Sequence, residues 1–368
     1  MECVDENDVL PLVDDIFAEP GRQLILPAEK HGRTMRPHGG EALHSLIGSS
    51  VLRQDFYLYR ASGAWWLPKY GTIIVDGRVM NRSHAEAAYF AKFPKNRDVF
   101  AAVLGQVGGA SARRMKRAFV SMPWGGTRNY GHFLIDCLPA LASFKSIAPH
   151  SWWAETKFPP LTAWQRAHLE RLRIEFLTEI EDEVVYVEDI MWSNAMDHYL
   201  QSPNVNVLDI RQPRAAPPPP RDKIFITRGT DDRRSFPGSA DLDAVFESLG
   251  FLLVEPSTLG IAEQIALFEG ARVVSGLTGA GFANTLFCQP DATVIEIMTP
   301  ALRGAGWRTW PSWLARTTAI TTCLASRVSR SPETSWTSHT SSQASDPRPN
   351  GVSGSDPARR PWPDRHLP

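Results

Sequence analysis

A histidine and an aspartate stand four residues apart at His132 and Asp136, where apolar residues recur at helical spacing. Residues four apart share one face of a helix, so the two side chains are predicted to lie side by side near its start. A histidine held by a carboxylate is a common general base, which takes a proton from a reacting hydroxyl. Either residue could be that base. The alternative is a hydrogen-bonded pair on a helix surface with no catalytic part.

Three glycines, Gly276, Gly279 and Gly281, interrupt a pattern between 272 and 300 that predicts strand, turn, short helix and strand. Glycine lets a backbone approach a ligand closely, and the N–H groups that open the following helix favour an anion such as phosphate. The turn is therefore predicted to bind a phosphate. A tight packing turn without a ligand is the alternative.

Arginines follow the predicted strand that begins at residue 221. Arg228 comes directly after it, and Arg233 and Arg234 lie in the next loop. Open α/β sheets bind ligands beyond the carboxyl ends of their strands, and guanidinium groups bind phosphate oxygens in pairs. The pattern predicts a diphosphate site. Solvated surface arginines are the alternative.

Asp241 and Asp243 form a D-x-D pattern, which can hold a metal ion. We predict no metal there, because the pair opens a helix, where acidic residues favour the positive end of the helix dipole. Other His, Cys, Asp and Glu residues do not show the spacing of metal ligands. The sequence therefore predicts a protein without a bound metal.

The elements that position these residues fall into two portions of a predicted α/β protein. Residues 1–212 are predicted to contain a β-rich part over 50–82 and a parallel α/β layer over 115–205. A proline-rich run at 213–220 is predicted to be an extended linker. Strands and helices then alternate again over 221–302.

From residue 303 the composition changes: lysine is absent, nine arginines occur, and Ser, Thr and Pro dominate. Such a segment cannot offset the entropy lost on ordering, so 303–368 is predicted to be mostly disordered and the domain at 221–302 truncated. One hypothesis is a shifted reading frame, since the α/β pattern stops just after a strand. Sequencing the gene tests it, because another frame should then encode the missing helices. An authentic disordered tail is the alternative.

The bulk composition predicts a soluble, cytoplasmic protein. Of 368 residues, 43% are hydrophobic, and the net charge of −1 argues against a protein that mainly binds nucleic acid. The four cysteines lack C-x-x-C spacing and are predicted to be reduced thiols. The acidic N-terminus does not resemble a signal peptide, and no run approaches the ~20 apolar residues of a membrane span. Association with a membrane surface stays open.

Three stretches carry motifs in a recognisable order. They are NYGHFLIDCLP at 129–139, ITR at 226–228 followed by the arginine pair, and GAGFAN at 279–284 followed by VIE at 294–296. Together they resemble glycosyltransferase family 61. Its pattern is N-Y-x-H-W/F-L-x-D-x-L-P, then I-S-R with two arginines, then H-G-A-G-x-x-N and V-I-E. The family includes plant β-1,2-xylosyltransferase, O-GlcNAc-transferring enzymes of the secretory pathway and bacterial capsular-polysaccharide proteins.

The resemblance implies a GT-B fold, in which two Rossmann-like domains face a cleft. It implies that the C-terminal domain holds most of a nucleotide-sugar donor such as a UDP-sugar. It also implies inverting transfer to a glycan or lipid-linked glycan in polysaccharide biosynthesis, with no obligatory metal and no cofactor besides the donor substrate.

The same resemblance implies roles for single residues. His132 or Asp136 would be the base, Arg228 would hold the diphosphate, and Glu296 would accept hydrogen bonds from the ribose hydroxyls. The further donor-site residues that it implies are Arg233, Thr278, Gly279, Ala280, Gly281 and Asn284.

Two other functions stay open. The chain has Thr278 where the family often has histidine, and Pro237-Gly238 where it often has Asn-Glu, which suits a non-catalytic or inactive sugar-nucleotide-binding homologue. The second is an NAD-dependent oxidoreductase. Dinucleotide-binding proteins have an acidic residue about 20 positions after the glycine loop. Glu296 lies 296 − 276 = 20 positions past Gly276. The glycine spacing, however, differs from G-x-G-x-x-G.

Overall fold

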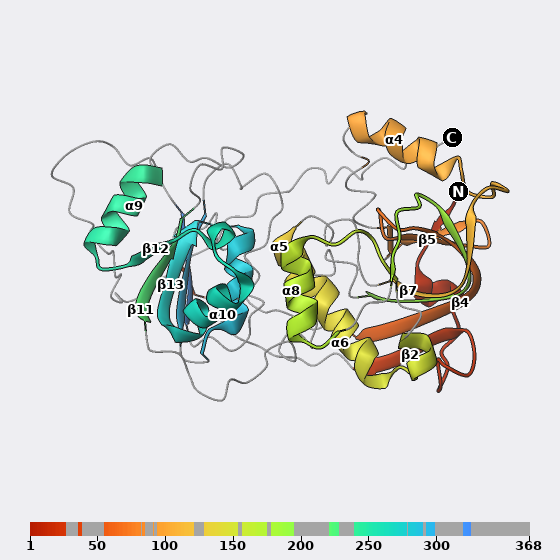
Figure 1. The fold of residues 1–368 in the computed structure, drawn as a ribbon, viewed down its shortest axis with the longest axis horizontal. Helices are drawn as coiled ribbons and strands as arrows, with labels where there is room; N and C mark the ends of the chain where they lie inside the picture. Colours follow the sequence, from red (N-terminus) through yellow and green to blue (C-terminus); the bar gives the residue numbers. More distant parts are fainter. Residues whose placement is uncertain are drawn as a thin grey trace, which may run out of the picture. The chain divides into compact units, whose positions relative to one another are not determined.

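The computed structural model of the chain shows two large β-sheets with helices packed on them (Figure 1). The predicted α/β class is confirmed. All described residues lie in one unit, Met1–Val328. The structure describes residues 1–26, 36–38, 55–81, 83–84, 91, 94–120, 129–153, 157–174, 178–194, 221–227, 239–277, 279–289, 292–298 and 319–324.

The first sheet is mixed. Its strand order is β1-β6-β5-β4-β10-β7, with β2 also paired to β4. Within 115–205 the strand pairs agree with the predicted parallel layer, since β10 runs parallel to β7, and β8 (Lys157–Phe158) runs parallel to β9 (Thr178–Glu179). The sheet is mixed because β10 also pairs antiparallel with β4, which comes from outside that range. Its strands are β1 (Cys3–Val4), β2 (Gly21–Leu26), β4 (Phe56–Leu67), β5 (Thr72–Val75), β6 (Arg78–Met80), β7 (Arg113–Val120) and β10 (Val185–Ser193).

The long strand β4 joins the two predicted parts of the N-terminal portion. Its first half pairs with β2, its second half pairs with β5, and its other edge pairs with β10. Gly63 stands between the two halves at φ 71°, a left-handed conformation that glycine adopts without strain. The β-rich part and the later strands therefore form one sheet.

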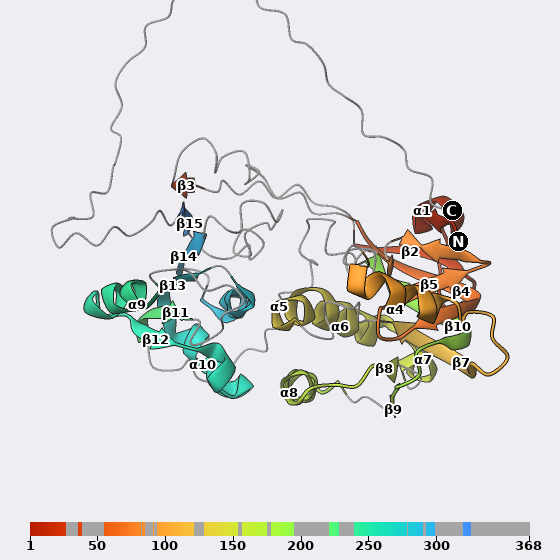
Figure 2. The same cartoon turned by 90° about the horizontal axis from the view of Figure 1, so that it is seen from above.

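The second sheet is parallel throughout, in the order β12-β11-β13-β14-β15-β3, which Figure 2 shows strand by strand. Alternate residues of each strand face opposite layers. Phe225 and Leu277 pack with Leu242 of α9, and Val274 packs in the cluster that contains Ile265 of α10. The strands are β3 (Arg36–His38), β11 (Arg221–Ile226), β12 (Leu252–Val254), β13 (Ala271–Leu277), β14 (Thr293–Met298) and β15 (Ala319–Leu324).

Two strands of this sheet come from segments that were predicted to lie elsewhere. β15 pairs with β14 although it lies in the predicted disordered tail, and β3 pairs with β15 although it belongs to the predicted N-terminal portion. Residues 319–324, a run rich in β-branched residues, thus form a strand between β14 and β3, so the predicted disorder of most of 303–368 does not extend to them. The linker at 213–220 and the rest of 303–368 lie outside the described residues.

The largest hydrophobic cluster joins segments from both sides of the predicted linker. It contains Phe133 and Leu141 together with Val274 and Phe282.

The remaining described elements are two short strands and the helices. The strands are β8 (Lys157–Phe158) and β9 (Thr178–Glu179). The helices are α1 (Glu6–Val9), α4 (Pro94–Leu104), α5 (Tyr130–His132), the π-helix η1 (Phe133–Cys137), α6 (Leu138–Ile147), α7 (His150–Trp153), α8 (Ala163–Arg171), α9 (Ser239–Ser248), the 3₁₀ helix η6 (Pro256–Thr258), α10 (Ile261–Gly270) and the 3₁₀ helix η7 (Ala280–Phe287).

Candidate active site

The predicted pair forms a direct hydrogen bond. His132 Nδ1 lies 2.9 Å from Asp136 Oδ2, and the two side chains are only 9% and 8% exposed. An ionised carboxylate only accepts, so the histidine donates from Nδ1. Asn129 caps the start of α5, because its Oδ1 accepts from the backbone N–H groups of Gly131 and His132. The pair is thus buried and held at the first turn of a helix.

A π-helical turn carries this pair. The backbone N–H of Leu138 donates to the carbonyl oxygen of Phe133, five residues earlier, just before Pro139. Proline has no N–H, and its ring clashes with the carbonyl four residues earlier in a regular α-helix. The wide turn ahead of Pro139 removes that conflict. Single π turns are frequent at functional sites.

Tyr130, two residues before His132, connects the first motif to the third. Its hydroxyl donates to Asn284 Oδ1 at 2.6 Å, and the Nδ2 of Asn284 donates to Gln264 Oε1 at 2.9 Å. His168 Nε2 lies 3.3 Å from the same hydroxyl. Asn284 is fully buried, so its amide holds η7 against α5 and α10, and direct donor contact for it stays a prediction.

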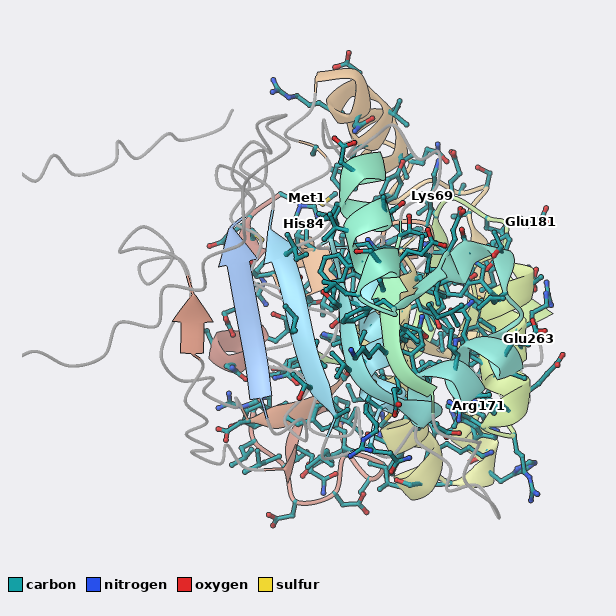
Figure 3. The ribbon with its side chains drawn as sticks, turned by 90° about the vertical axis from the view of Figure 1, so that its left-hand side faces the viewer. Met1, Lys69, His84, Arg171, Glu181 and Glu263 are labelled. Atoms are coloured by element: carbon teal, nitrogen blue, oxygen red, sulfur yellow. The ribbon has the colours of Figure 1, made fainter. Side chains whose placement is uncertain are left out.

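Burial shifts the pKa values of three side chains around this hydrogen bond: Tyr130, His168 and Arg171. Desolvation raises the pKa of Tyr130 well above its ordinary value, although the hydrogen bond to Asn284 acts in the opposite direction. Burial, followed by the charge of Arg171, lowers the pKa of His168 to about 3. Burial also lowers the pKa of Arg171, which Figure 3 labels. Its guanidinium carbon lies 5.4 Å from the centre of the Phe287 ring. At neutral pH the phenol keeps its proton and the imidazole is uncharged.

The glycine turn packs closely against β11. A Cβ on Gly276, which has φ +156°, would lie 2.6 Å from the carbonyl oxygen of Ile226. A Cβ on Gly281 would lie 3.3 Å from Ile226 Cγ2. Packing therefore explains these two glycines, while Gly279 has an extended backbone at φ 174°. The phosphate contacts of Gly279, Ala280 and Gly281 stay predictions.

The chain leaves β11 and β13 at the same edge of the sheet, because Ile226 pairs with Gly276 in parallel register. Thr278 comes directly after β13 and Arg228 two residues after the end of β11, and like Arg233 they lie outside the described residues. Thr227, just before Arg228, donates to Asp243 Oδ2 at 2.8 Å. The second acid of the D-x-D pattern thus helps to hold a strand end, and both acids lie on α9 as predicted.

Glu296 lies on β14, opposite Gly276 in the sheet register. Its side chain is fully buried. A buried carboxyl group in a protein is either hydrogen-bonded to another group or protonated. This position therefore suits a hydrogen bond within the protein as well as the predicted contact with the ribose. The ribose contact stays a prediction.

Four residues of this region were not predicted as site residues: Tyr130, His168, Arg171 and Gln264. Tyr130 stands inside the first motif, so the sequence did carry a signal for it. It carried none for the other three. Those three residues lie on α8 and α10, in helical segments that contain no recognisable motif. Only the packing of these helices brings them to η7.

Over the ranges that the structure describes, no helix is long and apolar enough to cross a membrane. Nor do three or more His, Cys, Asp or Glu side chains in those ranges come together as a metal site would require. The predicted lack of a metal stays a prediction.

The comparisons with known proteins agree with the three motifs. The family model described as Glycosyltransferase 61 matches residues 130–295, from Tyr130 of α5 to Ile295 of β14. No curated protein matches the chain. The matched stretch contains the His132–Asp136 pair and the whole of η7. Residues 130–295 therefore belong to glycosyltransferase family 61.

Proposed function

We propose that the chain is an inverting, metal-independent glycosyltransferase. It moves a sugar from a nucleotide-sugar donor, such as a UDP-sugar, to a hydroxyl of a glycan or lipid-linked glycan. Family membership supports glycosyltransferase activity in general. The observation that carries the finer proposal is the hydrogen bond from Tyr130 to Asn284, which joins the first motif to the third. It sets the helix of His132 beside the turn proposed to hold the donor.

In the proposed reaction, the acceptor oxygen bonds to the anomeric carbon while the bond from that carbon to the diphosphate oxygen breaks. The electron pair leaves with the diphosphate, and the acceptor proton passes to His132. The geometry supports histidine as the base, because a ring that donates from Nδ1 to Asp136 accepts a proton at Nε2. Asp136 also stabilises the imidazolium that forms.

On the donor side, Arg228 and Arg233 and the N–H groups of residues 278–281 are proposed to stabilise the leaving diphosphate. The parallel register of β11 and β13 supports this placement, since ligands of such sheets bind at the carboxyl ends. The second sheet is then the donor lobe of a GT-B-like arrangement. We place the reaction in the cytoplasm, where a lipid-linked acceptor would bring the enzyme to a membrane surface.

Hydrolysis of a panel of UDP- and GDP-sugars by the full-length chain tests this function, because glycosyltransferases hydrolyse donors slowly without an acceptor. We expect turnover of at least one donor. Arg228→Ala should raise the donor KM and abolish most of the turnover, whereas Arg272→Ala, at an exposed position of β13, should not. Donor binding without hydrolysis would favour the non-catalytic homologue. Binding of NAD(H) alone would favour the oxidoreductase.

A further inference from the structure

A chain of hydrogen bonds runs from α8 through α5 and η7 to the residues that precede α10. His168 Nε2 lies 3.3 Å from the Tyr130 hydroxyl, which lies 2.6 Å from Asn284 Oδ1. Asn284 Nδ2 lies 2.9 Å from Gln264 Oε1, and Gln264 Nε2 lies 3.0 Å from the carbonyl oxygen of Leu259. The side chains of His168 and Asn284 are fully buried, and that of Gln264 nearly so.

Each bond in this chain has only one possible direction. The Leu259 carbonyl only accepts, so Gln264 turns its NH₂ group toward it and its oxygen toward Asn284. Asn284 then donates to Gln264 and accepts the single proton of Tyr130. The Tyr130 oxygen in turn accepts from Nε2–H of His168, which sets the tautomer of that ring. Because a flip of either amide would cost at least one of these bonds, the network favours a single arrangement of its members.

The two ends of the Tyr130–Asn284 bond belong to two short helices. Tyr130 and His132 are two residues apart in the three-residue helix α5, whose start Asn129 caps. Asn284 lies in η7, which starts at Ala280. The bond therefore connects the helix that carries the proposed base to the helix that follows the proposed diphosphate turn.

We propose that Tyr130 is a positioning residue: its hydroxyl sets the distance between His132 and the donor turn without touching the substrate. This inference rests on the proposed function. It assigns to Tyr130 a part in turnover, beyond the stability that any buried hydrogen bond provides. A displacement of about 1 Å between reacting groups can lower the rate about 100-fold.

Tyr130→Phe removes only the hydroxyl, and hydrolysis of the UDP- and GDP-sugar panel by the full chain is the measurement. We expect kcat to fall about 10- to 100-fold with the donor KM changed less than about threefold, because the donor contacts lie on the other side of the bond. The pH profile should match that of the wild type, since His132 keeps Asp136. Tyr59→Phe is the matched control: it removes a buried tyrosine hydroxyl that donates to Asn7 Oδ1, outside the motifs, and should keep kcat.

A second measurement separates positioning from folding. Thermal melting of Tyr130→Phe and Tyr59→Phe shows the temperature range in which both variants are folded, and within that range a loss of kcat in Tyr130→Phe alone reports positioning rather than unfolding. If Tyr130→Phe lowers only the melting temperature and keeps kcat, the positioning role is wrong while the proposed function stands. If the wild type neither binds nor hydrolyses any donor of the panel, the proposed function fails and this inference fails with it.

Discussion

His132 and Asp136 differ from a helix-surface pair in their surroundings. Both are buried at a capped helix start that runs directly into a π turn, whereas a surface pair would be exposed on a regular helix. The alternative of a simple surface pair is therefore wrong. The burial also means that the pair is kept from bulk water, which strengthens the electrostatic part of their interaction.

We predict that His132→Ala lowers the kcat of donor turnover about 100- to 10,000-fold, the range that a general base contributes. Asp136→Asn should lower it less, because the ring remains but loses the partner that orients it. Steady-state kinetics measure both. His150→Ala, at an exposed histidine of α7, serves as the control. Equal turnover in His132→Ala and the wild type would exclude His132 as the base.

His168 should make stability depend on pH. Its folded-state pKa of about 3 lies below its ordinary value of 6.5, so the unfolded chain binds more protons between those values. The free energy of unfolding therefore rises with pH across that window and falls, by up to a few kcal/mol, as the pH drops from about 6.5 to 3. His84, whose pKa burial lowers to about 4, adds to the same slope.

Urea unfolding at several pH values measures this effect. His168→Gln can still donate to Tyr130 but does not titrate, so part of the slope should disappear while the contribution of His84 remains. His150→Gln should keep the wild-type slope. An unchanged slope in His168→Gln would show that this histidine has the same pKa in the folded and unfolded states.

At the scale of elements, β11, β13 and η7 meet at one crowded point. Ile226 ends β11, and both Gly276 and Gly281 lie against it. The glycine cluster was a sound signal for a close approach of backbones. The sequence, however, could not separate approach to a ligand from approach to a neighbouring strand, because glycine permits both.

Gly276→Ala should therefore destabilise the fold. Its new Cβ would meet the Ile226 carbonyl oxygen at 2.6 Å, and the residue also has a positive φ. Gly250→Ala is the control, because that glycine has φ +79° with no atom within 4 Å of the added Cβ. The loss in the free energy of unfolding should be about 1–3 kcal/mol larger at Gly276. Equal losses would mean that β11 moves away without cost.

At the scale of the whole molecule, every described element belongs to the unit Met1–Val328. The second sheet draws β3 from near the N-terminus and β15 from beyond residue 318. One hydrophobic cluster also contains residues from both sides of the predicted linker. The second sheet and the largest hydrophobic cluster thus both contain residues from either side of 213–220.

Shortening the chain tests this organisation. A chain that ends after Val328 should melt at the wild-type temperature, since it keeps all described elements. A chain that ends after Met298 loses β15, which leaves the edge of β14 unpaired and β3 without its partner. Its melting temperature should fall by about 5 °C or more, with a tendency to aggregate. Identical melting of both chains would mean that β15 contributes nothing to the sheet.

The sequence by itself determined the α/β class, the alternation of strands and helices after residue 220, the His132–Asp136 pair and the family. These follow from local properties: hydrophobic periodicity, four-residue helical spacing and short motifs. Only the tertiary structure decided that β10 pairs antiparallel with β4, that β3 and β15 complete the second sheet, and that Tyr130 bonds to Asn284. Strand order and contacts across 154 positions depend on which surfaces pack together, and neither periodicity nor spacing within a segment carries that information.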